Sequence, residues 1–419
     1  MKSLNVIILA TILMILPVIS CNYPARSYQV THANLDHLKH LYTEIEMNNG
    51  ACVGVLHIYS EYPDYQYAIE PDEGFTCVDD VARTIVLLTG YLENNNDSEV
   101  RDILENMTHF ILEMQSESGY FHNFLWGDGS VNKTYRTSVA EPNWWTWRAL
   151  WALAEVYPLL PEELALHTRN SAGMLISEVL ERYLNAPQDT ILFKGLQLPN
   201  WFPLGTAFDQ TAVLMIALVS YYHNIEKNAN VLELIKRFSE GLLLTQKGNE
   251  KEFPHYAFLS WNNLWHAYGN IQSYALMKSG VLLGKDELIK AALKEVDHFY
   301  PYLLENGIAH HFYLEERNEG LDTVDYSLFP QIAYGVRPLV YACVEAYEVT
   351  GDKKYAEMAR EAASWLHGNN PAETPMYNAS TGRCFDGIVS DTKVNLNSGA
   401  ESTIEALLTL QAIDKLPIH

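Results

Sequence analysis

The sequence predicts an all-α protein in which twelve helices form six hairpins and close into an (α/α)6 barrel. Helical hydrophobic periodicity runs through most of the 419 residues, and two kinds of helix alternate along the chain. Short and long connections alternate between these helices as well. The expected helices span residues 33–47, 77–94, 98–117, 141–157, 163–185, 206–225, 229–244, 262–280, 285–303, 330–350, 352–367 and 399–413.

In this order the odd-numbered helices are amphipathic and charged, whereas the even-numbered helices are apolar on nearly every side. Residues 208–222 contain one charged side chain, Asp209, and residues 265–279 contain only Lys278. A helix that is apolar all round is buried all round, while an amphipathic helix keeps one face in water. We therefore expect the even-numbered helices to form an inner ring and the odd-numbered helices to surround it.

The connections between helices also come in two kinds. Links from an even to an odd helix are short, such as residues 95–97 and the single Gly351. Links from an odd to an even helix are long, a length that is uncommon unless the loop is functional. These long links span residues 48–76, 118–140, 186–205, 245–261, 304–329 and 368–398. All would lie at the N-terminal ends of the inner helices, where we expect the functional site. An open helical solenoid is the alternative, but no repeat motif supports it.

The first twenty residues have the composition of a secretory signal, and residues 21–419 are expected to form a single domain. Lys2 precedes an apolar run over residues 6–19, which is too short to span a bilayer comfortably. The segment that ends at Cys21 resembles the bacterial lipobox, in which cleavage exposes a cysteine that then carries lipid. An ordinary signal peptide is the alternative. Asn22 is not the aspartate of inner-membrane retention, so the resemblance implies an exported lipoprotein anchored to the outer membrane, periplasmic or on the cell surface.

The charge balance excludes two classes of partner. The chain has 52 acidic and 28 basic side chains, a net charge of −24, whereas a binder of nucleic acid or of an anionic membrane needs a basic face. We expect a monomer that contacts the membrane only through its lipid. Four further cysteines match no zinc spacing and are expected to be free thiols or to form one or two disulfides: Cys52, Cys77, Cys343 and Cys384.

Acidic residues mark the first turns of the inner helices. Asp79, Glu141, Asp209 and Glu401 each follow a serine or threonine by three residues, so each fits a capping box. Asp80 is not needed for a cap, and two adjacent acids on an apolar helix are costly unless they are paired or used. Arg83 is their expected partner, three or four residues along the helix.

Convergence of these acids on one rim would suit glycoside hydrolysis, which needs one carboxyl group as acid and another as base or nucleophile. We expect Asp80 and Glu401 to fill these roles, in either order, with Asp79, Glu141 and Asp209 in support. Further rim residues are expected to bind sugar, the aromatic ones by stacking. They are Trp144, Trp145, Trp201, Trp261, Trp265, His266, Tyr268, Tyr334, Arg337 and Asp386. Trp147, Trp151 and Trp365, at helical spacing, are expected in the core.

Several short motifs carry a family resemblance. They are CVDDVAR at residues 77–83, RALWAL at 148–153, MYNASTG at 376–382, DG at 386–387 and NLNSGAEST at 395–403. Together they resemble the six-hairpin glycosidase superfamily, and more closely a helical-toroid family found as bacterial lipoproteins and as a domain attached to group-1 glycosyltransferases. The resemblance covers most of the chain after the signal and implies a role in carbohydrate metabolism. Val81 departs from the family, which often has asparagine there.

Two other functions remain open at this stage. A polysaccharide lyase or sugar epimerase on the same fold would need a histidine or tyrosine base, and His255-Tyr256, His310-His311 and Arg337 are available. A non-catalytic lipoprotein that binds glycans would need the aromatic residues but not the paired acids. No cofactor or metal is expected: Asp79, Asp80 and Asp325 offer oxygen ligands suited to Ca²⁺, but no calcium-binding loop is present. The sugar, its linkage and the stereochemical course stay undefined.

Overall fold

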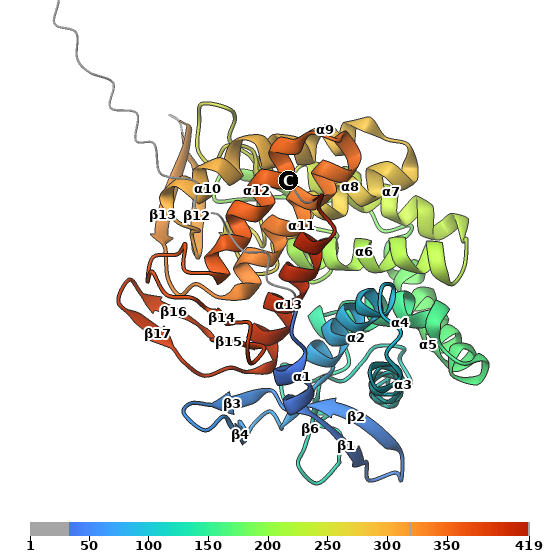
Figure 1. Ribbon diagram of the computed structural model, residues 1–419. Coiled ribbons are helices and arrows are strands. Elements are labelled where there is room, and N and C mark those ends of the chain that lie inside the picture. The colour runs from blue at the N-terminus through green and yellow to red at the C-terminus, as the bar shows by residue number, and fades with distance from the viewer. Residues whose placement is uncertain (1–32, 318–319, 418–419) are drawn as a thin grey trace, which may run out of the picture.

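The computed structural model describes residues 33–317 and 320–417, and helices dominate these ranges (Figure 1). The expected signal segment and the lipidation site Cys21 lie outside the described residues. Among the helices that the structure describes, none combines the length and the apolar character needed to cross a bilayer.

Six helices with apolar surfaces form an inner ring. They are α2 (Val78–Leu92), α4 (Trp144–Val156), α6 (Phe208–Asn224), α8 (Gln272–Leu283), α11 (Ala333–Thr350) and α13 (Ala400–Asp414). Each packs against the next in this order, and α13 packs back against α2. Burial is complete along much of the ring, since every residue from Phe208 to Tyr221 is buried. The expectation that the apolar, even-numbered helices are buried is thus confirmed for α6.

The remaining helices lie outside this ring and bury one face. They are α1 (Asp36–Leu41), α3 (Ser98–Glu113), α5 (Glu162–Tyr183), α7 (Ala229–Leu243), α9 (Asp286–Lys294) and α12 (Lys353–Ala363). A π-helical turn, η2 (Glu295–Phe299), joins α9 to α10 (Tyr300–Asn306), and the 3₁₀ turns η1 (Tyr157–Leu159) and η3 (Ser364–Leu366) follow α4 and α12. In α7 the buried residues include Val231, Leu234, Ile235 and Phe238, the spacing of a one-sided apolar stripe.

Short antiparallel strands occupy the long links that lead into the inner helices. The pairs are β1 (Tyr42–Glu46) with β2 (Cys52–Leu56), β3 (Tyr59–Glu61) with β4 (Gln66–Ala68), β5 (Thr76–Cys77) with β6 (Phe124–Leu125), β7 (Thr190–Phe193) with β8 (Leu196–Pro199), β9 (Gln246–Lys247) with β10 (Ala257–Phe258), β14 (Tyr377–Asn378) with β15 (Arg383–Cys384), and β16 (Gly387–Ser390) with β17 (Lys393–Asn395). A three-stranded sheet contains β11 (Leu264–His266), β12 (His311–Arg317) and β13 (Gly320–Ser327). In Figure 1 the strands β14 to β17 lie at the lower left, and β1 to β4 lie along the bottom of the molecule.

Two of the twelve expected helices are wrong in part. In the segment 33–47, α1 ends at Leu41, and the following residues form β1, which pairs with β2 from Tyr42 opposite Leu56. In the segment 262–280, residues Leu264–His266 form β11 against β12, and α8 begins only at Gln272. The latter stretch has almost no charge, so periodicity does not separate a buried strand from a buried helix there.

The structure tests two further expectations, one on the state of the cysteines and one on the tryptophans of the core. Cys52, Cys77, Cys343 and Cys384 are all free, so the expectation of free thiols is confirmed and the disulfide alternative is wrong for the described residues. The three tryptophans expected in the core are there: Trp147, Trp151 and Trp365 are 0%, 4% and 2% exposed.

One buried acid outside the inner ring makes stability depend on pH. Glu295 is fully buried, and its carboxyl group accepts hydrogen bonds from the Phe258 amide at 2.8 Å and the Ser273 hydroxyl at 2.5 Å. Burial raises its pKa from 4.5 to about 7, although these hydrogen bonds oppose the shift. The folded protein therefore keeps a proton that the unfolded chain releases above pH 4.5, and stability falls as pH rises towards 7.

We therefore expect Glu295→Gln, a neutral mimic of the protonated acid, to raise the free energy of unfolding at pH 8 by on the order of 3 kcal/mol relative to the wild type. At pH 4 the two proteins should differ little. Urea unfolding at both pH values measures this, with Glu357→Gln on the exposed face of α12 as the control. An equal pH dependence in wild type and Glu295→Gln would contradict the assignment.

Candidate functional site

A cavity of about 390 Å³ opens where the first turns of α2, α11 and α13 meet. Residues from the long links complete its wall. The lining residues are Ile58, Tyr59, Glu73, Cys77, Asp79, Asp80, Arg83, Asn123, Phe124, Ile332, Ala333, Tyr334, Asp386, Gly399, Glu401 and Ser402. The expected location of the site, at the N-terminal ends of inner helices, therefore coincides with a real cavity.

The first turn of α2 is held in place from two sides. Cys77 is the N-cap residue of α2, and its Sγ accepts a hydrogen bond from the Asp80 amide at 3.4 Å. The Asp79 amide donates to Oδ1 of Asn123 at 3.1 Å. The pairing of β5 with β6 brings the Asn123 segment beside this turn, since Cys77 lies opposite Phe124. These contacts fix the direction in which the two adjacent acids leave the helix.

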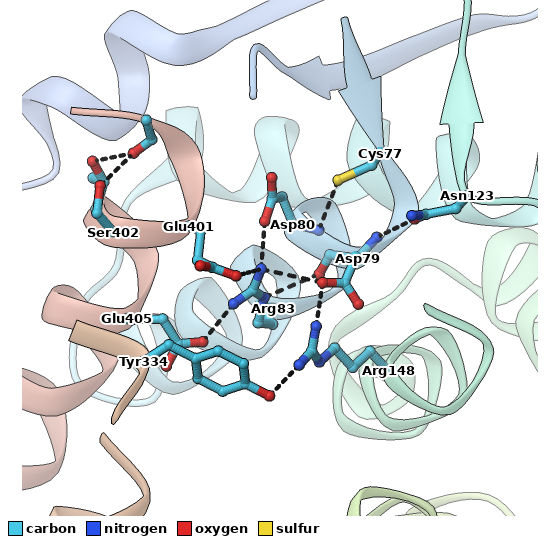
Figure 2. A network of polar contacts seen from close by, with 12 residues as sticks. Cys77, Asp79, Asp80, Arg83, Asn123, Arg148, Tyr334, Glu401, Ser402 and Glu405 are labelled. Atoms are coloured by element: carbon cyan, nitrogen blue, oxygen red, sulfur yellow. Dashed lines mark hydrogen bonds and ion pairs between the residues drawn. The ribbon is translucent and has the colours of Figure 1, made fainter. Parts of the chain in front are cut away.

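Arg83 is the centre of the polar network in Figure 2. Its Nη2 contacts Oδ1 of Asp80 at 2.5 Å, Oδ2 of Asp79 at 3.2 Å and Oε2 of Glu401 at 3.2 Å. Its Nη1 donates to Oε1 of Glu405 at 2.8 Å. The expected pairing of Arg83 with the adjacent acids is confirmed, and it extends to two acids on α13. Asp80 and Glu401 share one nitrogen and are therefore close neighbours across the cavity.

Two more arginines complete the network. Arg148 of α4 donates to Oδ2 of Asp79 and to the Tyr334 hydroxyl, and Nε of Arg337 donates to Oε2 of Glu405. Within the described residues of this network, three guanidinium groups thus face four carboxylates. Glu401 has the weakest hold on a cation, because Asp80 lies closer to the nitrogen that they share and Asp79 has Arg148 as a second partner.

Burial and charge divide these acids. Burial raises the pKa of Glu401, and the nearby charges of Asp80 and Glu405 add to the rise, while Arg83 opposes it. Burial also raises the pKa of Asp80 against the effect of Arg83. Glu405 behaves differently: burial alone would raise its pKa, but Arg337 and Arg83 outweigh burial and lower it. Glu405 is therefore a fixed anion, whereas Glu401, which lies beside two other acids and contacts a single shared nitrogen, is able to hold a proton.

A second group of residues lies beyond Tyr334. Nε2 of His266 is 2.9 Å from Oδ2 of Asp209, and both side chains are buried. The ring of His266 stacks on Tyr268 with 3.9 Å between centroids, and Tyr268 lies 6.2 Å from the ring of Tyr334. Burial raises the pKa of Tyr268, and the charges of Asp209 and Glu401 contribute to the rise. Tyr268 and Tyr334 thus connect this pair to the cavity.

The structure brings together some of the expected site residues. Asp79, Asp80, Glu401, Tyr334 and Asp386 all line the cavity. Asp209, His266 and Tyr268 form the neighbouring group described above. Glu141 lines neither, and its carboxylate accepts a hydrogen bond from Nδ2 of Asn143 at 2.9 Å beside the start of α4. Asp325 of β13 lies 3.5 Å from His311, away from the cavity wall.

The expectation that aromatic residues form the sugar-binding rim needs correction. Trp145, Trp201 and Trp265 are 4%, 7% and 2% exposed and belong to the hydrophobic core, where burial removes their large apolar rings from water. Trp144 is half-buried beneath the guanidinium of Arg148, 5.0 Å from its ring, and Trp261 is 43% exposed.

Arg337 also differs from its expected role in binding substrate. It is 2% exposed and is engaged by Glu405, so it supports the network from behind and does not reach the cavity surface. Sequence reasoning also missed Glu405, Arg148 and Glu73. The first two had a usable signal, because each is a charged residue on an otherwise apolar inner helix.

Solved structures with the same fold are enzymes of sugar chemistry by their names. A sugar epimerase from a ruminal bacterium superposes with a TM-score of 0.66 at 13% identity, over 93% of this chain and 98% of that one. Cellobiose 2-epimerase from Bacillus thermoamylovorans gives 0.64 at 11% identity, over 92% and 96%. A family 76 glycoside hydrolase from a bovine Bacteroides thetaiotaomicron strain gives 0.55 at 11% identity, over 86% and 75%.

No protein-family model and no curated protein matches the sequence. The class that the comparisons define is therefore structural: the chain shares a helix-rich fold with solved structures that are named as sugar epimerases and as a family 76 glycoside hydrolase.

Proposed function

We propose that the chain is a carbohydrate-active enzyme on an (α/α)6 toroid, and that it hydrolyses glycosidic bonds in the cavity above α2 and α13. The closed order of contacts through the six inner helices supports the toroid. Three structures that share this fold carry the names of sugar-converting enzymes, which supports a sugar as substrate.

The observation that carries the proposal is the unequal environment of two neighbouring carboxyl groups. Asp80 is buried and lies 2.5 Å from Arg83, whereas Glu401 holds only a shared contact at 3.2 Å and faces the cavity. Hydrolysis requires such a pair, one group protonated and one ionised. Glu401 therefore serves as the general acid that protonates the leaving oxygen, and Asp80 serves as the base or nucleophile.

A sugar epimerase is the second candidate, because of the pair of Asp209 and His266. With Nε2 of His266 donating to Asp209, Nδ1 keeps a lone pair, and this buried atom makes no hydrogen bond within the described part of the chain. A histidine oriented by a carboxylate is a suitable base for removing a proton next to a sugar carbonyl. The two candidates thus place the chemistry on opposite sides of Tyr334.

Isotopes from the solvent separate the two reactions. We expect the wild-type protein, incubated with a panel of uncharged oligosaccharides in H₂¹⁸O, to release sugars with ¹⁸O at a new reducing end, detected by mass spectrometry. Asp80→Asn, prepared identically, controls for contaminating hydrolases and should release none. Deuterium incorporated from D₂O at a ring carbon, without bond cleavage, would instead establish the epimerase and would be lost in His266→Gln. If neither ¹⁸O nor deuterium is incorporated into any sugar of the panel, the proposed function is contradicted.

A further inference from the structure

The wall of the cavity is strongly unbalanced in charge. Five carboxylate side chains line it, and the only cation among the described lining residues is Arg83. The five acids are Glu73, Asp79, Asp80, Asp386 and Glu401. They come from α2, from α13 and from the links that precede these two helices, so they surround the space from several directions.

The single cation of the wall is already fully engaged. Arg83 is 1% exposed, and its two terminal nitrogens contact four carboxylates, including Glu405 behind the wall. Arg148 is engaged by Asp79 and Tyr334, and Arg337 by Glu405. Nη1 of Arg337 has no hydrogen-bond partner within the described residues, but neither Arg337 nor Arg148 lines the cavity, so neither offers its charge to an anion there.

Two of the acids have only uncharged partners. Glu73 accepts a hydrogen bond from the Tyr59 hydroxyl at 3.0 Å. Asp386 accepts from the Gly399 amide at 2.8 Å and the Ser402 hydroxyl at 2.7 Å. Burial raises the pKa of Asp386 while these two hydrogen bonds oppose the rise, and no cation takes part. Even with Glu401 protonated as the proposed general acid, the other four acids outnumber the one cation of the described wall, and no cation contacts Glu73 or Asp386.

We propose that the cavity selects its sugar by charge, accepting uncharged and ammonium-bearing sugars and excluding those that carry carboxylate, sulfate or phosphate. The proposal rests on the proposed sugar site and narrows its substrate class. Hydroxyl and ammonium groups donate hydrogen bonds to carboxylates. An anionic group would lose its water beside several like charges with no counter-ion. A lyase must neutralise the uronate of its substrate, so this cavity is unsuited to that reaction.

Matched sugars test the selection directly. We expect calorimetry at pH 7 to show that glucuronate binds at least about tenfold more weakly than glucose, and that glucosamine binds at least as tightly as glucose, because like charges facing each other in a binding site are strongly unfavourable. Mannose, mannuronate and mannosamine provide the same comparison with the other configuration at C2. Each series varies the charge on one ring scaffold.

Two variants localise the effect. Glu73→Gln removes one wall charge that no cation compensates and should narrow the difference between the neutral sugar and its uronate. Glu357→Gln removes the same charge from exposed α12 and should leave that difference unchanged. A uronate that binds as tightly as its neutral parent would overturn charge selection while leaving the sugar site intact. Binding of no sugar in either series would overturn the sugar site and this proposal with it.

Discussion

Replacement of Arg83 by leucine is expected to lower the free energy of unfolding by about 3–5 kcal/mol at pH 7, because removing one partner of a buried ion pair leaves an uncompensated charge. Four carboxylates would lose their shared cation, two of them almost fully buried: the side chains of Asp80 and Glu405 are 4% and 0% exposed. Without Arg83 the pKa values of Asp80 and Glu401 should rise further, and the pKa of Glu405 should lose part of the effect that lowers it. The loss of stability should therefore shrink as pH falls and the acids take up protons.

Urea unfolding of wild type and Arg83→Leu at pH 7 and pH 5 measures this loss. Arg169→Leu is the matched control, since it removes the same charge from an exposed position on α5. Equal losses in the two variants would show that Arg83 has no special structural role. If Arg83→Leu does not accumulate as folded protein, Arg83→Lys provides the measurement. It keeps the charge but not the planar fork, and we expect a smaller loss from it.

Glu401→Gln is expected to lower kcat by about 10²- to 10⁴-fold on an oligosaccharide that the wild type hydrolyses, because general acid catalysis contributes about that much. Glutamine keeps the shape of the side chain but has no proton to transfer. The raised pKa of Glu401 means that its proton persists to higher pH than in free glutamic acid. Activity should fall as pH rises through that pKa, and this alkaline limb of the pH profile should be absent in the variant.

The leaving group separates a general acid from a residue that only shapes the cavity. In a dinitrophenyl glycoside of the same sugar, the leaving group is dinitrophenolate, which departs without protonation. Glu401→Gln should therefore hydrolyse this glycoside nearly as fast as the wild type does. Glu357→Gln controls for the change in net charge and should match the wild type on both substrates. An equal loss on the oligosaccharide and on the dinitrophenyl glycoside would contradict the assigned role of Glu401.

The hairpin architecture was accessible from sequence because it depends on local patterns. An apolar helix such as α6, with one charge, is distinguishable from an amphipathic helix such as α7 without knowing what packs against either. The acids of the cavity were accessible for the same reason, since Asp80 and Glu401 are rare charges on such helices. Trp145 and Trp265 were assigned wrongly to the rim. Stacking on a sugar and packing in a core both require a large aromatic side chain, so the sequence does not separate the two roles.

The interpretation of the capping motifs illustrates what sequence left undecided. Serine or threonine three residues before an acid predicted caps at Thr76, Ser138, Thr206 and Ser398. The N-cap residues of these four helices are instead Cys77, Asn143, Ala207 and Gly399. Tertiary partners decide the outcome: the Thr206 hydroxyl, for example, donates to Asn262 in a distant link. The ion pairs of Arg83 with α13 likewise depend on contacts between opposite ends of the chain.

The position of the site in the closed ring has a consequence for synthesis. Arg83 and Asp80 belong to the first inner helix, whereas Glu401 and Glu405 belong to the last, more than 300 residues later. The cavity therefore lies at the seam where α13 meets α2. During synthesis Arg83 is therefore made long before Glu401 and Glu405, the two of its four acidic partners that lie on α13. The site is thus completed only when α13 has been made, and a chain truncated before residue 400 lacks Glu401, Ser402 and Glu405.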